Sequence, residues 1–277
     1  MTDLAVQAIN PNKALWEKGD FTRIADTMRQ SGDELVDTLG ITPGMTVLDL
    51  GCGDGTTALP AAEYGADVTG VDIAENLVTA GNARARAAGL DNLRFHQGDA
   101  SNLEGIGDDR YDLVLSIFGA MFAPRPDDVA REMVRVTRPG GRIVMGNWIP
   151  GDPTLVAQIL KISAAYTPPP PAGFVSPMTW GDESIVRKRF EDAGIAADDV
   201  HFERATWYFR TPGPPGDLLS TFRHFYGPTM NAFEAARKDG REPELARELD
   251  ALFEAQNRAE SGTEIPATFL KVTVAKG

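Results

Sequence analysis

Hydrophobic and polar positions change their spacing repeatedly between residues 31 and 148, and the changes predict strands and helices in alternation. Short apolar runs typical of buried strands lie at 46–50, 67–71, 93–96, 111–117 and 142–148. Amphipathic spacing between these runs predicts helices at 31–39, 56–64, 74–88 and 127–136. Strands that alternate with helices of this length form a parallel sheet covered on both faces, so the predicted fold class is α/β.

Polar and glycine residues mark the ends of several elements. Ser31 and Glu34 have the spacing of a capping box, which predicts that the first helix begins at Ser31. Gly65 and Gly89 follow two of the helical patterns and are expected to end them. The sequence 139–141, Pro-Gly-Gly, predicts a turn before the fifth strand.

The second half of the chain is less regular but continues the same alternation. It predicts a helix at 182–193, a strand at 200–210, a mostly helical stretch at 216–259 and a last strand at 267–275. Four prolines at 168–171 favour extended backbone, and residues 151–181 are interpreted as a loop or lid. Because the last strand can pair with the sheet, we predict one domain, residues 1–277. It comprises an N-terminal lid segment (1–30), a core (31–150) and a helical cap insert (211–262).

A glycine-rich loop with acidic partners is the strongest functional signal. The strand ending at Leu50 runs into Gly51, Gly53 and Gly55, which permit a tight turn and close approach of a ligand. Asp72 ends the second strand, and Asp99 follows the third. A carboxylate in such a position can accept hydrogen bonds from both hydroxyls of a ribose. Ligands bind at the carboxyl ends of the strands in open α/β sheets, so a nucleotide-type site is predicted there.

Two other nucleotide sites fit the loop less well. A dinucleotide site needs its third glycine at position 56, where this chain has Thr56, and no Tyr is followed by Lys four residues on. No Gly-Lys-Ser/Thr follows the glycines, which excludes a Walker-type loop. Glycines and aspartates after strands can also be plain turn and cap residues, but three such positions on successive strands argue against that interpretation.

The whole arrangement resembles the class I S-adenosylmethionine-dependent methyltransferases, in particular their small-molecule branch (methyltransferase type 11/25-like). The motifs that carry the resemblance are Val-Leu-Asp-Leu-Gly-Cys-Gly-Asp-Gly at 47–55 and Arg-Pro-Gly-Gly-Arg-Ile at 138–143. The resemblance implies a Rossmann-like seven-stranded sheet, mostly parallel with the last strand antiparallel, and S-adenosylmethionine as the cofactor.

The resemblance also implies roles for individual residues. Asp49 would help to hold the amino end of the methionine moiety, and the loop with Cys52 at its middle would line its passage. Asp72 would bind the ribose hydroxyls, Ile73 would pack on the adenine, and Asp99 with Ala100 would read its edge. Ser116, Ile117 and Phe118 would lie near the sulfur. The implied cofactor-binding residues are Asp49, Gly51, Cys52, Gly53, Gly55, Asp72, Ile73, Asp99, Ala100 and Ser116.

Composition limits the classes of partner that such an enzyme is expected to bind. The 277 residues include 27 Lys and Arg against 40 Asp and Glu, and the net charge of −13 argues against nucleic acid and anionic membranes as partners. The single cysteine excludes an internal disulfide and a Cys-rich metal centre, and no His/Asp constellation predicts a metal site. The first residues lack the pattern of a secretion signal, so a cytoplasmic location is expected. The sequence neither predicts nor excludes a homo-oligomer.

Methyl transfer is an in-line displacement, in which the protein mainly binds, aligns and excludes water. The residues at 116–118 match neither the nucleophilic cysteine nor the Pro-Pro motif of enzymes that methylate nucleic-acid bases. We therefore expect the acceptor to be an O, N, S or C atom of a small, partly apolar metabolite.

Catalytic residues are harder to predict, because such chemistry needs a base only when the nucleophile is weakly acidic. His224 and Tyr226 in the insert are the candidates for a base. Trp16 and Phe21 can either close over the cofactor or pack beneath the first core helix. A nicotinamide-dependent oxidoreductase and a non-catalytic cofactor-binding module remain the alternatives.

Overall fold

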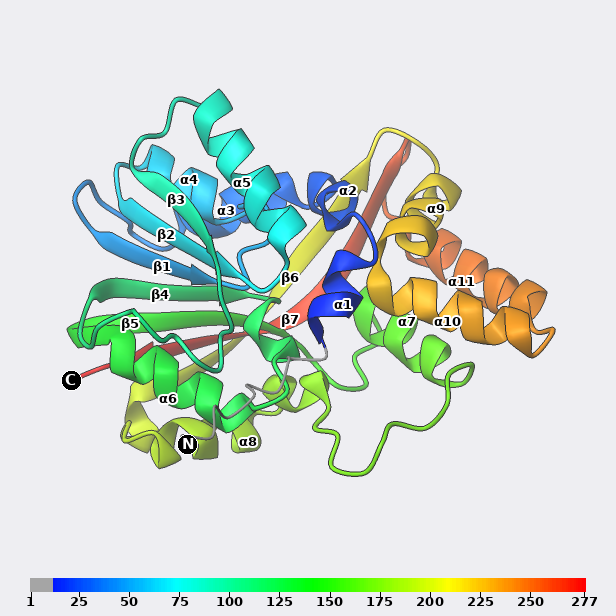
Figure 1. The fold of residues 1–277 in the computed structure, drawn as a ribbon. Coiled ribbons are helices and arrows are strands. Elements are labelled where there is room, and N and C mark those ends of the chain that lie inside the picture. Colours follow the sequence, from blue (N-terminus) through cyan, green and yellow to red (C-terminus); the bar gives the residue numbers. More distant parts are fainter. Residues whose placement is uncertain (1–11) are drawn as a thin grey trace, which may run out of the picture.

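A seven-stranded sheet runs through the centre of the computed structural model, which describes residues 12–277 (Figure 1). The strand order is β3-β2-β1-β4-β5-β7-β6. Neighbouring strands from β3 to β5 pair in parallel, whereas β7 is antiparallel to both β5 and β6. The strands are β1 (Thr46–Leu50), β2 (Asp67–Asp72), β3 (Leu93–Gln97), β4 (Tyr111–Ile117), β5 (Thr137–Trp148), β6 (Val200–Thr211) and β7 (Thr263–Ala275). This topology confirms the predicted Rossmann-like sheet with an antiparallel last strand.

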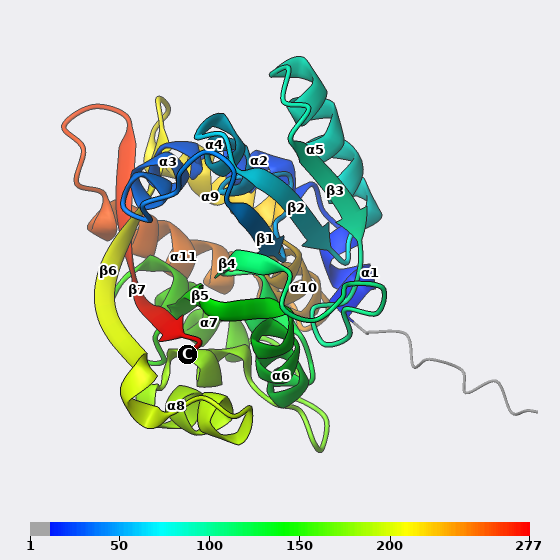
Figure 2. The same ribbon diagram turned by 90° about the vertical axis from the view of Figure 1, so that its left-hand side faces the viewer.

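Helices cover both faces of the sheet and extend beyond its carboxyl-terminal edge. Figure 1 and Figure 2 place α3, α4 and α5 over one face and α6 and α8 over the other. A third group, α7 with α9, α10 and α11, packs together beside the carboxyl ends of β1 and β4. The helices are α1 (Asn12–Glu17), α2 (Phe21–Asp26), α3 (Arg29–Asp37), α4 (Ala58–Glu63), α5 (Glu75–Ala87), α6 (Pro126–Val136), α7 (Leu155–Ala164), α8 (Glu183–Asp192), α9 (Pro215–Phe225), α10 (Gly227–Lys238) and α11 (Glu242–Gln256).

The helices α9 to α11 form an insertion in a hairpin. Strands β6 and β7 pair along their whole length, from Val200 opposite Val274 to Thr211 opposite Thr263. The chain therefore leaves the sheet at Thr211, builds the three helices and returns directly opposite its exit. We call α9, α10 and α11 the cap.

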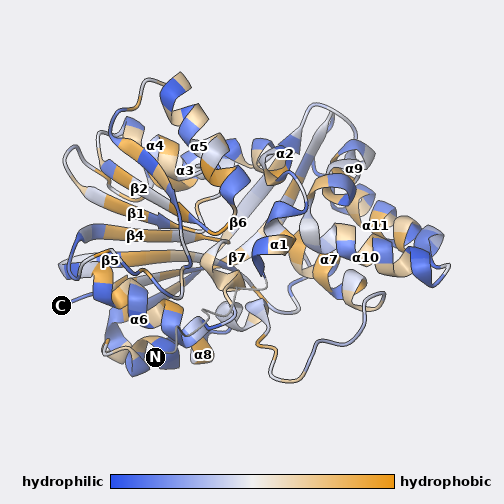
Figure 3. Cartoon of the chain, viewed as in Figure 1, coloured by the Kyte–Doolittle hydropathy of each residue, from blue (hydrophilic) through white to orange (hydrophobic). Residues whose placement is uncertain are grey.

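The core has two parts, one on each side of the sheet. Buried apolar residues of α3, α4 and α5 pack against one face of the central strands. A larger cluster joins the other face to α6, α8, α7 and the cap. Figure 3 shows the apolar character of the central strands. Within residues 12–277, no helix combines the length and the apolar character that crossing a membrane requires.

Three expectations about individual elements were wrong. The first core helix begins at Arg29 and not at Ser31. Ser31 does not cap the helix, because its hydroxyl donates to the carbonyl oxygen of Tyr208 on β6 (3.1 Å) and accepts from the N–H of Tyr208 (3.0 Å). The segment 151–181 contains the helix α7, whose apolar face is buried. Strand β5 begins at Thr137, so it includes the predicted turn at 139–141. The first eleven residues of the predicted lid segment lie outside the described residues.

Candidate functional site

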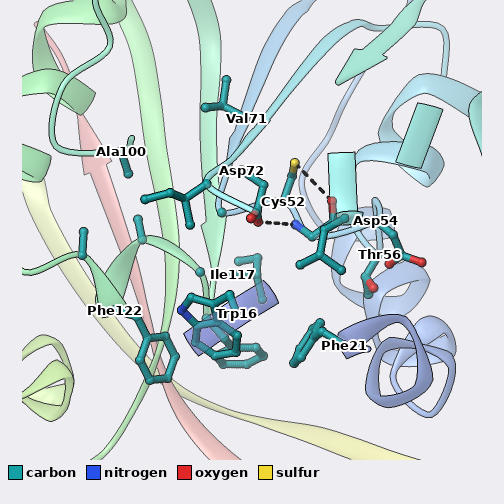
Figure 4. A pocket seen from close by; sticks show the side chains of 18 of the residues that line it. Trp16, Phe21, Cys52, Asp54, Thr56, Val71, Asp72, Ala100, Ile117 and Phe122 are labelled. Atoms are coloured by element: carbon teal, nitrogen blue, oxygen red, sulfur yellow. Dashed lines mark hydrogen bonds between the residues drawn. The ribbon is translucent and has the colours of Figure 1, made fainter. Parts of the chain in front are cut away.

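A pocket of about 930 Å³, including its open mouth, lies at the carboxyl ends of the central strands (Figure 4). It is bounded by the glycine loop after β1, the ends of β2 and β4 and the N-terminal helices. We call it the first cavity. Seven of the ten predicted cofactor-binding residues line it: Gly51, Cys52, Gly53, Asp72, Ile73, Asp99 and Ala100. Asp49, Gly55 and Ser116 do not.

The three glycines of the loop have different physical tasks. Gly51 has a φ of 65°, and a Cβ on it would lie 2.5 Å from the Cα of Gly119, so the loops after β1 and β4 touch through their backbones. At Gly53, with a φ of 55°, a Cβ would meet only Phe21, at 3.9 Å, so this backbone faces the first cavity. A Cβ on Gly55 would lie 2.3 Å from the Cδ1 of Leu59, which makes Gly55 a packing residue behind the loop.

Asp72 joins the glycine loop to the end of β2. Its Oδ2 accepts a hydrogen bond from the N–H of Gly53 (2.8 Å), and its Oδ1 accepts from the N–H of Ala74 (2.9 Å). Burial raises the pKa of this carboxyl, and the two backbone donors act against that rise. The carboxyl is thus held against the backbone that faces the first cavity (Figure 4).

Asp99 and Ala100 form the part of the rim that follows β3. The Oδ1 of Asp99 accepts from the N–H (2.9 Å) and the hydroxyl (2.6 Å) of Ser101, which fixes the turn after the strand. Gln97, at the end of β3, donates to the carbonyl oxygen of Ile73 (3.0 Å). The rim after β3 is thereby tied to the rim after β2, next to Asp72.

Two predicted residues support the loops from behind. Asp49 is 1% exposed and accepts a hydrogen bond from the hydroxyl of Thr57 (2.6 Å). Burial raises the pKa of Asp49 to about 7. Ser116, also 1% exposed, donates to the carbonyl oxygen of Leu50 (2.7 Å) and accepts from the N–H of Ala120 (2.9 Å). Each of these side chains holds neighbouring backbone or side chains in place and does not face the cavity.

An ion-pair network below the loop was not predicted. Asp54 lines the first cavity and is 2% exposed, and its Oδ1 accepts from Arg29 of α3 at 2.8 Å. Arg29 also donates to the hydroxyl of Thr56 (2.6 Å), and Arg84 of α5 donates to the carbonyl oxygen of Asp54 (2.6 Å). A buried carboxylate needs such partners. The partners lie 25 and 30 residues away, so no local pattern reveals them.

Cys52 is a buried thiol within the first cavity. Its Sγ lies 3.6 Å from the carbonyl oxygen of Gly53 (Figure 4), and burial together with nearby carboxylates raises its pKa well above the ordinary value. A thiol that stays protonated is a poor nucleophile. Among residues 12–277, no group of three His, Cys, Asp or Glu side chains is arranged to hold a metal ion.

A second cavity of about 330 Å³, including its open mouth, adjoins the first. Five residues line both: Trp16, Phe21, Met28, Phe118 and Phe122. The second cavity is completed by Ile24, Trp148, Val156, Phe209, Phe222 and Tyr226. Every one of these residues is apolar or aromatic, so the polar rim of the first cavity continues into an aromatic compartment.

The N-terminal helices lie over both cavities. Trp16 contacts the rings of Phe21 (centroids 5.7 Å apart) and Phe122 (4.9 Å). Glu17 accepts from the backbone N–H of Glu75 at the start of α5 (3.1 Å). On the cap side, Lys18 forms an ion pair with Glu234 of α10 (2.8 Å). The segment 12–18 therefore bridges the start of α5 and the cap.

Phe118 forms part of the wall shared by the two cavities. Its φ is 61°, a conformation that a non-glycine residue rarely adopts. Its ring stacks on Trp148 with centroids 3.7 Å apart and meets Trp207 edge-on at 5.0 Å. The unusual backbone turns the ring from the end of β4 into the aromatic cluster.

The two candidate bases lie in different surroundings. His224 is exposed, its ring Nδ1 is 2.8 Å from the carbonyl oxygen of Ser220, and it lines neither cavity. Tyr226 is buried, and it lines the second cavity. His224 lies in the last turn of α9, whereas Tyr226 follows the helix with extended backbone. Of the two candidate bases, Tyr226 lines a cavity and His224 does not.

Known proteins share both the sequence and the fold of this chain. A family model described as a methyltransferase domain matches residues 41–167. The protein Rv1403c of Mycobacterium tuberculosis is 36% identical over 241 residues, which cover 87% of this chain and 84% of that protein. Methyltransferase GfsG of Streptomyces halstedii is 35% identical over 126 residues, 45% of each chain. The YcgJ protein of Bacillus subtilis matches the fold with a TM-score of 0.57 and 18% identity, over 90% of this chain and 99% of that one.

Proposed function

The chain belongs to the class I S-adenosylmethionine-dependent methyltransferases, and from that premise we propose that its acceptor is a small, partly apolar molecule held in the second cavity. The observation that carries the proposal is the shared lining: the cavity beside the glycine loop and the aromatic cavity meet at Trp16, Phe21 and Phe118. A cofactor in one and an acceptor in the other would lie next to each other at these residues.

The residues of the first cavity fit S-adenosylmethionine. The backbone of Gly53 faces the cavity where a side chain would fill space, and the Asp72 carboxyl lies against it. In this proposal Asp72 accepts from the ribose hydroxyls, Ile73 packs on the adenine, and Asp99 with Ala100 recognises its edge. Gly51, Cys52 and Gly53 line the passage of the methionine moiety, and Asp49, Gly55 and Ser116 keep the loops in shape.

The bound cofactor supplies a methyl group activated by a sulfonium, and the chain supplies binding, alignment and exclusion of water. The aromatic side chains of the second cavity remove water from the acceptor, and Phe118 helps to fix the distance between the two compartments. In the proposal, α1 and α2 act as a lid, because Trp16 and Phe21 cover both cavities.

Charge and cysteine content support the choice of a small acceptor. A net charge of −13 opposes the phosphates of nucleic acids. The single thiol is buried, which is compatible with the reducing cytoplasm that we include in the proposal. The aromatic lining of the second cavity offers contact area to an organic molecule and no charged partner.

The proposal is tested by calorimetric titration with S-adenosylhomocysteine, the demethylated cofactor. Asp72→Asn should weaken binding about 10- to 100-fold, because hydrogen bonds to a charged group contribute about 1.5–3 kcal/mol. The matched control is Asp67→Asn, at the exposed start of the same strand, which should bind like the wild type. Wild-type protein that binds no S-adenosylhomocysteine, or equal affinity in Asp72→Asn, would refute the assignment.

A further inference from the structure

The second cavity contains almost no polar atoms. Besides the residues shared with the first cavity, its walls comprise Ile24 from α2, Trp148 at the end of β5, Val156 from α7, Phe209 from β6, and Phe222 and Tyr226 from the cap. None of the described residues that line it carries a charge. An ionic group brought into such a cavity would lose its hydration without gaining a partner, which costs several kcal/mol (on the order of 5).

Tyr226 is the one hydroxyl-bearing residue among the described residues that line the second cavity. The residue is 5% exposed, and its ring packs against Phe222 (centroids 5.3 Å apart), Trp16 (6.0 Å) and Phe21 (6.3 Å). Among the described residues, no atom forms a hydrogen bond with its Oη. Burial raises the pKa of Tyr226, so the hydroxyl stays protonated and acts as a donor instead of a base. A hydroxyl without a protein partner gains a hydrogen bond when a ligand supplies an acceptor.

Charged groups on the elements around Tyr226 are engaged elsewhere. Glu17, at the end of α1, accepts from the start of α5, and Lys18, directly after α1, pairs with α10. On α2, Arg23 pairs with Asp20. On α9, Arg223 pairs with Glu242, and His224 contacts Ser220. None of these groups lines the second cavity, so no protein charge is available there to balance an ammonium or a carboxylate.

Resting on the proposed function, we propose that the acceptor is an uncharged aromatic or enolic hydroxyl compound whose oxygen accepts a hydrogen bond from Tyr226. Its ring packs among the aromatic side chains of the second cavity. Trp16, Phe21 and Phe222 would surround it with ring faces and edges, an arrangement that favours flat aromatic molecules over flexible aliphatic ones.

The chemistry of such an acceptor suits a cavity without a base. The hydroxyl proton is released to water, and the oxygen lone pair attacks the methyl carbon of S-adenosylmethionine. The O–C bond forms while the S–C bond breaks, and its electron pair returns to sulfur, which yields the methyl ether and S-adenosylhomocysteine. The positive charge of the sulfonium leaves with that proton, so the ether and the thioether that remain in the cavities are both uncharged. A low-dielectric cavity favours this charge neutralisation. A cationic amine would find no carboxylate in the second cavity.

Three probes with one ring system and different charges test the acceptor class. These are 2-naphthol, 2-(aminomethyl)naphthalene and 2-naphthoic acid. Each is titrated into protein saturated with S-adenosylhomocysteine, and in a separate reaction each is incubated with protein and S-adenosylmethionine and assayed for methylation by mass spectrometry. We expect 2-naphthol to bind at least tenfold more tightly than the two charged probes and to be the one that is methylated. Preference for the amine or the acid, or binding of none of the three, overturns the inference. In each of those cases, binding of S-adenosylhomocysteine leaves the cofactor assignment standing.

The hydrogen bond is tested by Tyr226→Phe with naphthalene as the matched ligand. Loss of a neutral hydrogen bond of about 0.5–1.5 kcal/mol should weaken 2-naphthol binding about two- to tenfold. Naphthalene, which lacks the hydroxyl, should bind wild type and variant equally, and S-adenosylhomocysteine affinity should not change. Tyr64→Phe, which removes an exposed hydroxyl bonded to Asp37, is the control and should change neither ligand. Equal effects of Tyr226→Phe on both naphthalene ligands, or none on 2-naphthol, contradict the inference.

Discussion

At the scale of single residues, Phe118 shows backbone strain held in place by packing. A left-handed φ costs a residue with a Cβ roughly 1–2 kcal/mol. The ring offsets this cost, because it stacks on Trp148 and meets both Trp207 and Phe269 edge-on. Strain of this kind gathers where a fold positions a functional group. Here it turns the ring into the wall between the two cavities.

The strain at Phe118 predicts that a glycine variant is more stable than an alanine variant, the reverse of the usual order. Phe118→Ala and Phe118→Gly both lose the ring, but only glycine relaxes at a φ of 61°. Phe118→Gly should therefore be more stable than Phe118→Ala by about 1 kcal/mol in urea unfolding. At Ala251, exposed on α11, Ala251→Gly should instead lose about 0.5–1 kcal/mol. An alanine variant at 118 that is as stable as the glycine variant would contradict the argument.

Asp49 links the stability of the protein to pH. Its pKa is about 7 in the folded protein against an ordinary value of 3.8, because burial disfavours the charged form. Between these two values the folded state keeps the proton that the unfolded chain releases. Stability must therefore fall as pH rises from about 4 to about 7 and then level off.

Asp49→Asn removes this dependence, since an amide does not ionise and can still accept from Thr57. Between pH 4 and pH 7, the difference in the free energy of unfolding between variant and wild type should shift in favour of the variant by on the order of 4 kcal/mol. Urea unfolding at several pH values measures the difference, with Asp250→Asn on the exposed face of α11 as the control. Parallel pH profiles of wild type and Asp49→Asn would show that Asp49 ionises alike in both states.

At the scale of elements, the sequence predicts most of the sheet and less of what surrounds it. The strands β1 and β4 have the predicted bounds, because continuous apolar runs between turn residues are distinctive. The helix α7 was missed, since its apolar sequence beside four prolines has few polar positions to define a period. Ser31 was predicted to cap a helix, but its hydroxyl bonds to Tyr208 on β6, 177 residues away in the sequence.

The candidate site was also predicted only in part. The motif residues that line the first cavity follow strand ends, whose common edge is a consequence of parallel pairing. The ion pair of Arg29 with Asp54, and the contribution of Trp207 from β6, depend on contacts between distant segments. His224 was proposed as a base from its residue type. Its exposure follows from which face of α9 packs against α2, α10 and α11, and the sequence alone does not determine that face.

At the scale of the whole molecule, the sheet and the cap contribute residues to different cavities. The residues assigned to the cofactor come from the ends of β1 to β4, whereas the second cavity also needs Phe222 and Tyr226 of the cap. The cap is inserted between Thr211 and Thr263, which already face each other in the β6–β7 hairpin. The fold can therefore change the acceptor compartment without interrupting the sheet.

This arrangement predicts that the two binding functions can be separated. Replacement of residues 212–262 by Asn-Gly would join Thr211 to Thr263 through a two-residue hairpin turn. The shortened protein should still bind S-adenosylhomocysteine, more weakly because Lys18, directly after α1, loses its partner on α10. It should no longer bind 2-naphthol, whose compartment has lost a wall. Calorimetry measures both affinities, and circular dichroism reports whether the sheet is retained.

A milder variant protects this test against failure to fold. Phe222→Ala keeps the cap but removes one ring from the wall of the second cavity, at a cost in stability of about 3–5 kcal/mol. It should weaken 2-naphthol binding and leave S-adenosylhomocysteine affinity unchanged, since Phe222 does not line the first cavity. A capless protein that binds 2-naphthol as tightly as the full chain would show that the acceptor lies elsewhere. If Phe222→Ala weakened both ligands equally, the two cavities would form a single binding unit.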